Sequence, residues 1–210
     1  MLRSAVRLLA LTLLLLVAAP VAAQPPAAPL PKVVLVGDSI RLGYAPLVAK
    51  KLEGKAVVVS PAANGGDSAN VLKHLDEWVA RERPDLVHVN CGLHDLKLGK
   101  ATKKHQVELD DYRQNLRRIV DRIRSETGAT VVFANTTPIH DERHARRNAE
   151  FDRTDAAVLR YNEAARDVMS EAGVPVHDLH TIVRRGGVEA LLTADGTHYT
   201  PAGNELLAGV

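Results

Sequence analysis

The chain of 210 residues is 46% hydrophobic and 25% charged, and its formal net charge is +2 at pH 7. Arg3 and Arg7, the only charged residues among residues 1–23, account for that whole excess. The rest of the chain has equal numbers of acidic and basic residues, so its net charge gives no indication of nucleic-acid binding. Cys91 is the only cysteine, which excludes an intrachain disulfide.

Residues 1–23 have the pattern of a secretory signal peptide. A basic start precedes the apolar stretch Leu8–Val17, and Val21-Ala22-Ala23 is a small-residue cleavage site. The apolar run is shorter than a bilayer-spanning helix requires. We therefore expect a secreted or periplasmic protein with no membrane span in its mature chain. A proline-rich leader is expected at 24–31 and a single domain at 32–210.

Short valine-rich runs alternate with helical patterns along this domain. Because the runs are continuously apolar, they predict strands buried on both faces, as in a parallel sheet. The expected strands are Val33–Val36, Val57–Val59, Leu86–Val89 and Val131–Ala134, with Val174–Val176 as a short fifth.

Between these strands, apolar residues at helical spacing predict helices. They are expected over Val71–Val79 (ending before Pro84), Leu109–Ile123 (ending at Gly128) and Val158–Met169 (ending near Gly173). Repeated strand–helix units of this kind predict a three-layer α/β/α sandwich around a doubly wound, mainly parallel five-stranded sheet.

Polar segments follow four of the expected strands. In doubly wound sheets, ligands bind beyond the carboxyl ends of the strands, so these segments are expected to converge there. They are Ser39, Asn64–Ser68, Asn90–Asp95 and Asn135–Pro138.

Two short motifs supply the parts of a serine nucleophile. Gly37-Asp38-Ser39 lies between the first strand and a helix, where free N–H groups and the helix dipole favour negative charge. Asp195-Gly196-Thr197-His198, before the final helix, offers a histidine base and a carboxylate to orient it. Together Ser39, His198 and Asp195 fill the roles that acyl transfer through serine requires.

These motifs occur in order with Asn64-Gly65-Gly66-Asp67 and Gly92-Leu93-His94-Asp95, and the whole domain resembles the SGNH hydrolases, or GDSL esterase/lipase family. The resemblance implies a flavodoxin-like fold. It also implies that Ser39 attacks the ester, His198 is the base and Asp195 orients it. The backbone N–H groups of Ser39 and Gly66 would then line the oxyanion hole.

His94 stands where the family usually has asparagine, the third oxyanion donor. A neutral imidazole N–H can replace an amide N–H when the other ring nitrogen has a partner that fixes the tautomer. Asp95 is adjacent and is a candidate for that partner. His94 therefore matches the third donor by position.

Other polar residues near these motifs could have either a structural role or a role in catalysis or binding. Asp38 is expected to bond local backbone rather than to act as a catalytic carboxylate. Asn64 and Asn90 either support the oxyanion hole, touch substrate or form turns. His88 is expected to be a satisfied core histidine, and Cys91 a buried small apolar residue rather than a nucleophile.

The segment from Asp141 to Arg153 is dense in both signs of charge. His140 and His144 have the i, i+4 spacing of a metal pair, but they lack a third ligand and the zincin order, so no metal is expected. The segment is either a solvated face or a border of the site. In the second case its arginines Arg143, Arg146 and Arg147 would contact an anionic or sugar substrate.

The sequence thus predicts a secreted serine esterase that works through an acyl-serine intermediate and requires no cofactor. The expected substrate is a small-molecule or carbohydrate ester with a small acyl group, such as acetyl. An acyltransferase with the same triad is the enzymatic alternative. A carbohydrate-binding protein with weak catalysis is the alternative from another class. The sequence identifies neither further substrate-binding residues nor the oligomeric state.

Overall fold

A computed structural model describes residues 28–210 of the chain. The predicted signal peptide and residues 24–27 of the predicted leader lie outside these described residues. Residues 28–31 have no regular structure and lead directly into the first strand.

The core of the molecule is a five-stranded sheet in which all neighbouring strands are parallel, in the order β2-β1-β3-β5-β7. The sheet therefore confirms the predicted doubly wound α/β fold. Its strands are β1 (Lys32–Val36), β2 (Val57–Val59), β3 (Leu86–Val89), β5 (Thr130–Ala134) and β7 (Val176–His177).

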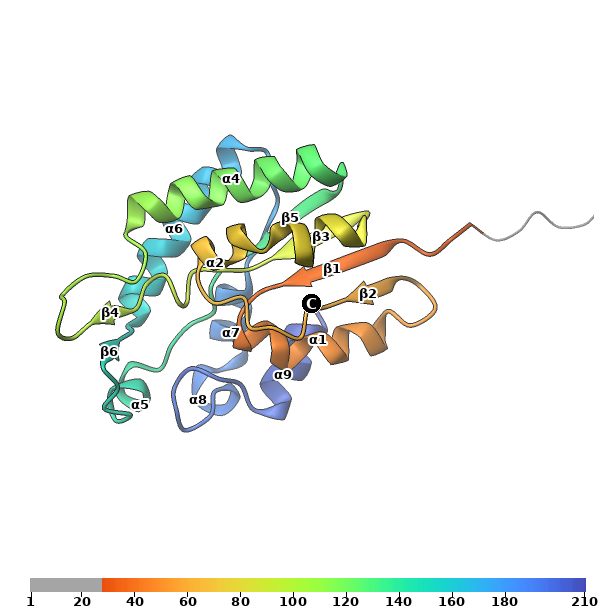
Figure 1. The fold of residues 1–210 in the computed structure, drawn as a ribbon. Helices are drawn as coiled ribbons and strands as arrows, with labels where there is room; N and C mark the ends of the chain where they lie inside the picture. Colours follow the sequence, from red (N-terminus) through yellow and green to blue (C-terminus); the bar gives the residue numbers. More distant parts are fainter. Residues whose placement is uncertain (1–27) are drawn as a thin grey trace, which may run out of the picture.

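Helices cover both faces of this sheet (Figure 1). On one face are α2 (Ser68–Lys73), α3 (Leu75–Trp78), the 3₁₀ helix η1 (Ala80–Glu82), α4 (Leu109–Thr127) and α6 (Asp155–Glu171). On the other are α1 (Ser39–Lys51), α7 (Leu179–Gly186), α8 (Val188–Leu191) and α9 (Pro201–Ala208). Within the described residues 28–210, no helix has the length and apolar character needed to cross a membrane.

Three of the predicted elements differ from the structure. The fifth strand, expected at Val174–Val176, forms at Val176–His177 instead. The expected helix over Val71–Val79 is interrupted at His74, which caps the C-terminus of α2. The Nδ1 atom of His74 lies 2.9 Å from the carbonyl oxygen of Asn70. The strand β2 is not buried on both faces, because it forms the edge of the sheet and leaves Val57 45% exposed.

A second, two-stranded antiparallel sheet lies beyond the carboxyl edge of the main sheet and was not predicted. It pairs β4 (Leu98–Gly99) with β6 (Phe151–Asp152), and the short helix α5 (Asp141–Ala145) lies close to β6 (Figure 1). Strands of this length carry no detectable periodicity. The pairing brings two distant segments to the same side of the molecule as Ser39.

Candidate active site

The turn between β1 and α1 presents Ser39 as the first residue of the helix. Asp38 caps that helix, and its Oδ1 accepts a hydrogen bond of 2.9 Å from the backbone N–H of Ile40. Asp38 is fully buried, and this burial raises the pKa of its carboxyl group. The side chain therefore shapes the turn locally, as expected from the sequence.

Arg41, which the sequence did not single out, ties this turn to the segment after β2. Its guanidinium is buried and donates to the carbonyl oxygens of Gly37 (2.8 Å) and Ala63 (2.7 Å). It also donates to the hydroxyl of Ser60 (2.7 Å) and the carbonyl of Pro61 (2.6 Å). Charged side chains are rarely buried, so no sequence signal marks such a residue.

The structure brings Ser39, His198 and Asp195 into one hydrogen-bonded chain. Ser39 Oγ lies 2.9 Å from His198 Nε2, and His198 Nδ1 lies 2.5 Å from Asp195 Oδ2. Because the carboxylate accepts the proton on Nδ1, Nε2 is left to accept the proton of the serine hydroxyl. This is the geometry in which an imidazole activates a serine.

Asp195 is held in the ionised form by its surroundings. Partial burial on its own raises the pKa of the carboxyl group. Hydrogen bonds from the His198 ring, from backbone N–H groups and from the Thr193 hydroxyl outweigh that effect and bring the pKa well below its usual value. Oδ1 accepts from the N–H groups of Thr197 and His198, each at 2.9 Å, so the carboxylate is fixed on both oxygens.

The loop that carries Asp195 and His198 rests against α5. The N–H of His140 donates to the carbonyl oxygen of Gly196 at 2.9 Å. Gly196 has φ +70, and a Cβ there would lie 2.6 Å from the His140 carbonyl oxygen and 2.7 Å from the His144 nitrogen. Only glycine fits this contact, which holds the loop of Asp195 and His198 against α5.

Gly66 follows β2 and lies in a loop that is fastened to the serine turn. The N–H of Gly65 donates to Gly37 O at 2.9 Å, and Asn70 Nδ2 donates to Gly65 O at 2.8 Å. The N–H of Gly66 itself donates to Asn64 Oδ1 at 2.9 Å. Asn64 therefore forms a turn here. To bind an oxyanion, the Gly66 N–H would have to break its hydrogen bond to Asn64 Oδ1.

His94 has a different partner from the expected one. Asp95 is fully buried and accepts hydrogen bonds from the N–H and the hydroxyl of Ser68, so the prediction that it partners His94 is wrong. Instead, the Lys97 ammonium lies 3.0 Å from His94 Nδ1. Since an ammonium only donates, Nδ1 is the acceptor and the neutral ring carries its proton on Nε2.

Burial and the neighbouring charges keep the ring of His94 neutral. Burial, together with the positive charges of Lys97 and Arg153, lowers the pKa of His94 to about 4. At neutral pH the ring therefore offers an N–H donor rather than a full positive charge.

The chain matches the sequence profile of the GDSL-like lipase/acylhydrolase family over residues 35–206. It belongs to this family. Family members act on ester bonds, and the chain is accordingly a hydrolase of esters. The matched segment includes every predicted site residue, from Ser39 to His198.

Relatives and solved structures agree with this assignment. An isoamyl acetate-hydrolyzing esterase 1 homolog of Rattus norvegicus is 27% identical over 194 residues, covering 84% of this chain and 78% of the relative. A lipase/acylhydrolase from Enterococcus faecalis has a TM-score of 0.72 at 25% identity, covering 86% of this chain and 92% of that one. Axe2, an acetylxylan esterase from Geobacillus stearothermophilus, shares the fold with a TM-score of 0.70 at 20% identity, covering 85% and 91%.

Other predicted residues of this GDSL hydrolase have structural contacts. Asn90 donates to Ala134 O at 2.8 Å and so joins the ends of β3 and β5. Cys91 is fully buried, and burial raises the pKa of its thiol well above the usual value. A thiol of this kind is a poor nucleophile, in keeping with the predicted structural role.

The histidines and arginines of the charged segment are mostly engaged with neighbouring residues. His140 Nε2 lies 2.7 Å from Glu189 Oε1, and His144 Nδ1 lies 3.1 Å from the Thr197 hydroxyl. Arg143 pairs with Glu189 at 2.7 Å and also donates to two backbone carbonyls. The histidine pair and Arg143 therefore brace the loop of Asp195.

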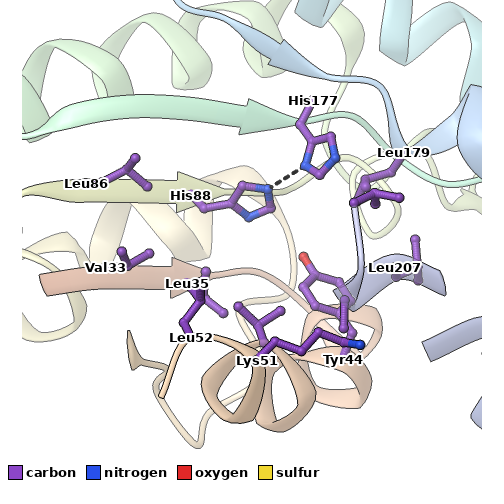
Figure 2. A pocket seen from close by; sticks show the side chains of 13 residues that line it. Val33, Leu35, Tyr44, Lys51, Leu52, Leu86, His88, His177, Leu179 and Leu207 are labelled. Atoms are coloured by element: carbon purple, nitrogen blue, oxygen red, sulfur yellow. Dashed lines mark hydrogen bonds between the residues drawn. The ribbon is translucent and has the colours of Figure 1, made fainter. Parts of the chain in front are cut away.

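A pocket of about 270 Å³ lies away from this site, between the sheet, α1 and α9 (Figure 2). His88 Nε2 lies 3.2 Å from His177 Nδ1 on the sheet side of this pocket. His88 Nδ1 is buried and has no partner among the described residues, so the expectation of a satisfied core histidine is wrong. Neither Ser39 nor His198 lines the pocket.

Proposed function

We propose that this GDSL hydrolase cleaves carboxylic esters through an acyl-enzyme formed on Ser39. The unbroken hydrogen-bond chain from Ser39 through His198 to Asp195 carries the proposal. His198 takes the serine proton as Oγ attacks the carbonyl carbon, and it then gives that proton to the departing alcohol. Water, activated by the same imidazole, resolves the acyl-serine and releases the acid.

Three donors are proposed to hold the oxyanion that forms during attack. The N–H of Ser39 lies at the start of α1, where the helix dipole favours negative charge. The N–H of Gly66 replaces its bond to Asn64, and Nε2–H of His94 is the third donor. Lys97 supports this role of His94 because it occupies Nδ1. Loss of one such donor costs about 3–4 kcal/mol of transition-state stabilisation.

The proposed substrates are esters with a small acyl group, above all acetyl, on an alcohol that includes carbohydrate. The names of the relatives support this, since one is called an isoamyl acetate-hydrolyzing esterase 1 homolog and another an acetylxylan esterase. The open position of the triad is also consistent with a bulky alcohol, because the His198 side chain is 43% exposed. Export of the enzyme is proposed from the signal pattern of residues 1–23.

Covalent labelling tests the serine mechanism directly. A fluorophosphonate probe should label the purified protein on Ser39, because only an activated serine reacts quickly. Ser39→Ala should block labelling and lower the turnover of 4-nitrophenyl acetate by about 10⁴-fold or more. Its thermal midpoint should stay close to that of wild type. More than a tenth of wild-type turnover in folded Ser39→Ala would overturn the proposal.

Product analysis separates hydrolysis from acyl transfer. With acetyl esters in water, we expect acetic acid as the acyl product even when glycerol or a xylo-oligosaccharide is present as an acceptor. Acetylated acceptor as the main product would identify a transferase instead.

A further inference from the structure

Arg153 is a buried cation that no carboxylate of the described residues contacts directly. The residue is only 7% exposed, and its Nε is buried with no hydrogen-bond partner among residues 28–210. Glu189, Glu142 and Asp155 pair with Arg143, Arg146 and Arg184, and Asp152 pairs with Lys100. Asp38 and Asp195 favour the charged form of Arg153 through space, without a direct ion pair. A buried charge left without a partner costs free energy. A buried arginine without a direct partner is therefore unusual unless a ligand binds it.

The small β4–β6 sheet places a second cation beside Arg153. Leu98 pairs with Asp152 in an antiparallel register, so the next pair along the ladder sets Lys97 opposite Arg153. Both cations lie over the same ring, with Lys97 Nζ and Arg153 Cζ each 5.0 Å from the centroid of Phe151. Cation–π contacts offset part of the cost of this arrangement, but like charges on opposite strands remain unfavourable.

This pair of cations borders the reacting groups. Lys97 bonds directly to His94, which we place in the oxyanion hole. The charge of Arg153 reaches both sides of the site, since it contributes to lowering the pKa of His94 and favours the ionised form of Asp38, the neighbour of Ser39. An anion bound between Arg153 and Lys97 would thus lie next to a substrate that is held by Ser39.

We propose that Arg153 and Lys97 form an anion subsite beside the oxyanion hole, and that the preferred esters carry a carboxylate close to the scissile bond. This inference rests on the proposed function and names its substrate class. A guanidinium presents paired N–H groups that match a carboxylate, and Lys97 adds charge next to it. The carboxylate belongs to either the acyl group or the alcohol, and separate pairs of esters distinguish these two positions.

Matched esters test the subsite. For the acyl side, kcat/KM is compared between 4-nitrophenyl hydrogen glutarate and 4-nitrophenyl valerate, after subtraction of the uncatalysed rates. For the alcohol side, the acetyl ester of lactate is compared with the acetyl ester of methyl lactate. In one of these pairs we expect the anionic ester to be preferred by about 10- to 100-fold, the range of one or two charge-assisted hydrogen bonds.

Variants assign the preference to Arg153. Arg153→Met should remove the preference, and Arg153→Lys should keep part of it, because the charge remains while the paired donors are lost. The readout is the ratio of anionic to neutral ester within each variant, so a general loss of folded enzyme cancels. Arg146→Met is the matched control: this arginine lies in the same segment, but its side chain is 75% exposed, so the ratio should stay at the wild-type value.

The outcomes separate this inference from the proposed function. Equal kcat/KM for the anionic and neutral members of both pairs in wild type would overturn the subsite, while the serine mechanism would stand. An Arg153→Met ratio equal to that of wild type would also overturn it and leave Arg153 with a structural role. Absence of fluorophosphonate labelling would instead overturn the proposed function.

Discussion

The two sides of the active site are built in different ways. On one side, Asp195 and His198 come from a single short loop, and the carboxylate accepts both the ring proton and the backbone N–H of the same histidine. On the other side, His94 depends on Lys97, and Lys97 lies over Phe151, which is far along the chain. On the first side the two catalytic residues orient each other through local hydrogen bonds, whereas the second side is assembled by the pairing of two short strands.

This difference matters because each construction has a different weak point. In the local loop, geometry depends on the close approach of Gly196 to α5. In the assembled side, the protonation state of His94 depends on its burial and on nearby charges. Substitutions on both sides should therefore lower kcat, but only those on the second side should also change the pKa of His94.

The largest effect among these substitutions is expected at His94. His94→Ala should lower kcat by about 10²–10³-fold with little change in KM, because the lost contact strengthens only as the oxyanion forms. His94→Asn should retain substantial activity, since the amide supplies a comparable N–H. Steady-state kinetics on 4-nitrophenyl acetate and thermal midpoints for both variants check this. A wild-type kcat in His94→Ala would show that the third-donor assignment is wrong.

Gly196→Ala tests the local side. A Cβ at this position would collide with the backbone of His140 and His144, so the loop must move. We expect kcat to fall by about 10²-fold, the usual result of a shift of about 1 Å in a catalytic group. Gly54→Ala is the matched control, because Gly54 has a similar φ of +72 but no atom within 4 Å of the place that a Cβ would take. It should cost about 1–2 kcal/mol of stability through backbone strain and leave kcat unchanged. Equal kcat values for the two variants would mean that α5 does not position the loop.

Lys97→Met tests the assembled side through the pH dependence of His94. Removing the ammonium takes away a positive charge and the donor to Nδ1, so the pKa of His94 should rise from about 4 toward its ordinary value of 6.5. Burial and the charges of Arg153 and His198 still oppose the rise, while Asp67 favours it. With the tautomer no longer fixed, kcat on a neutral ester should fall by about 2- to 5-fold at pH 7. An NMR titration of the ring measures the pKa, and Lys97→Arg should restore both values. An unchanged titration in Lys97→Met would break the link between the two residues.

The sequence predicted the parts of the molecule that depend on local order. Four strands of the main sheet are mostly apolar runs that the sequence marks within a residue or two, and the fifth was expected two residues early. The end of α4 at Gly128 is also predictable, because glycine readily adopts the positive φ of +71 found there. Ser39, Asp195 and His198 could be singled out because each lies in a short motif next to a strand or helix end. The family match over residues 35–206 then agrees with the predicted family.

The remaining features depend on contacts between distant segments, for which the sequence carries no local signal. Arg41 is a charged residue inside a helix, and only the arrival of four acceptors from the turn and the β2 loop explains its burial. Lys97 and Arg153 flank a ladder of only two residues per strand. Asp95 was the expected partner of His94 because it is adjacent in sequence, yet its carboxylate is turned toward Ser68.

The smallest effect on activity is expected at His88, which lies outside both sides of the site. Burial, and then the charge of His177, lowers the pKa of His88 to about 4, below its ordinary value of 6.5. Between these two pH values the unfolded chain therefore binds more protons than the folded one. The free energy of unfolding should consequently rise with pH across this window and be lost as the pH falls from 6.5 toward 4.

His88→Leu removes this linkage and the unpaired Nδ1 that lines the apolar pocket in Figure 2. At pH 5 the histidine costs up to about 2 kcal/mol, at about 1.4 kcal/mol per pH unit below its ordinary pKa. The difference in thermal midpoint between pH 7 and pH 5 should therefore shrink in the variant. It should not vanish, because His94 has a similarly lowered pKa and is linked to folding in the same direction. Activity at pH 7 should match wild type, since His88 touches none of the reacting groups. If the variant and wild type lose equal stability between pH 7 and pH 5, His88 is not the source of the acid sensitivity. The other histidines whose pKa is lowered, His94, His144 and His177, must then carry it.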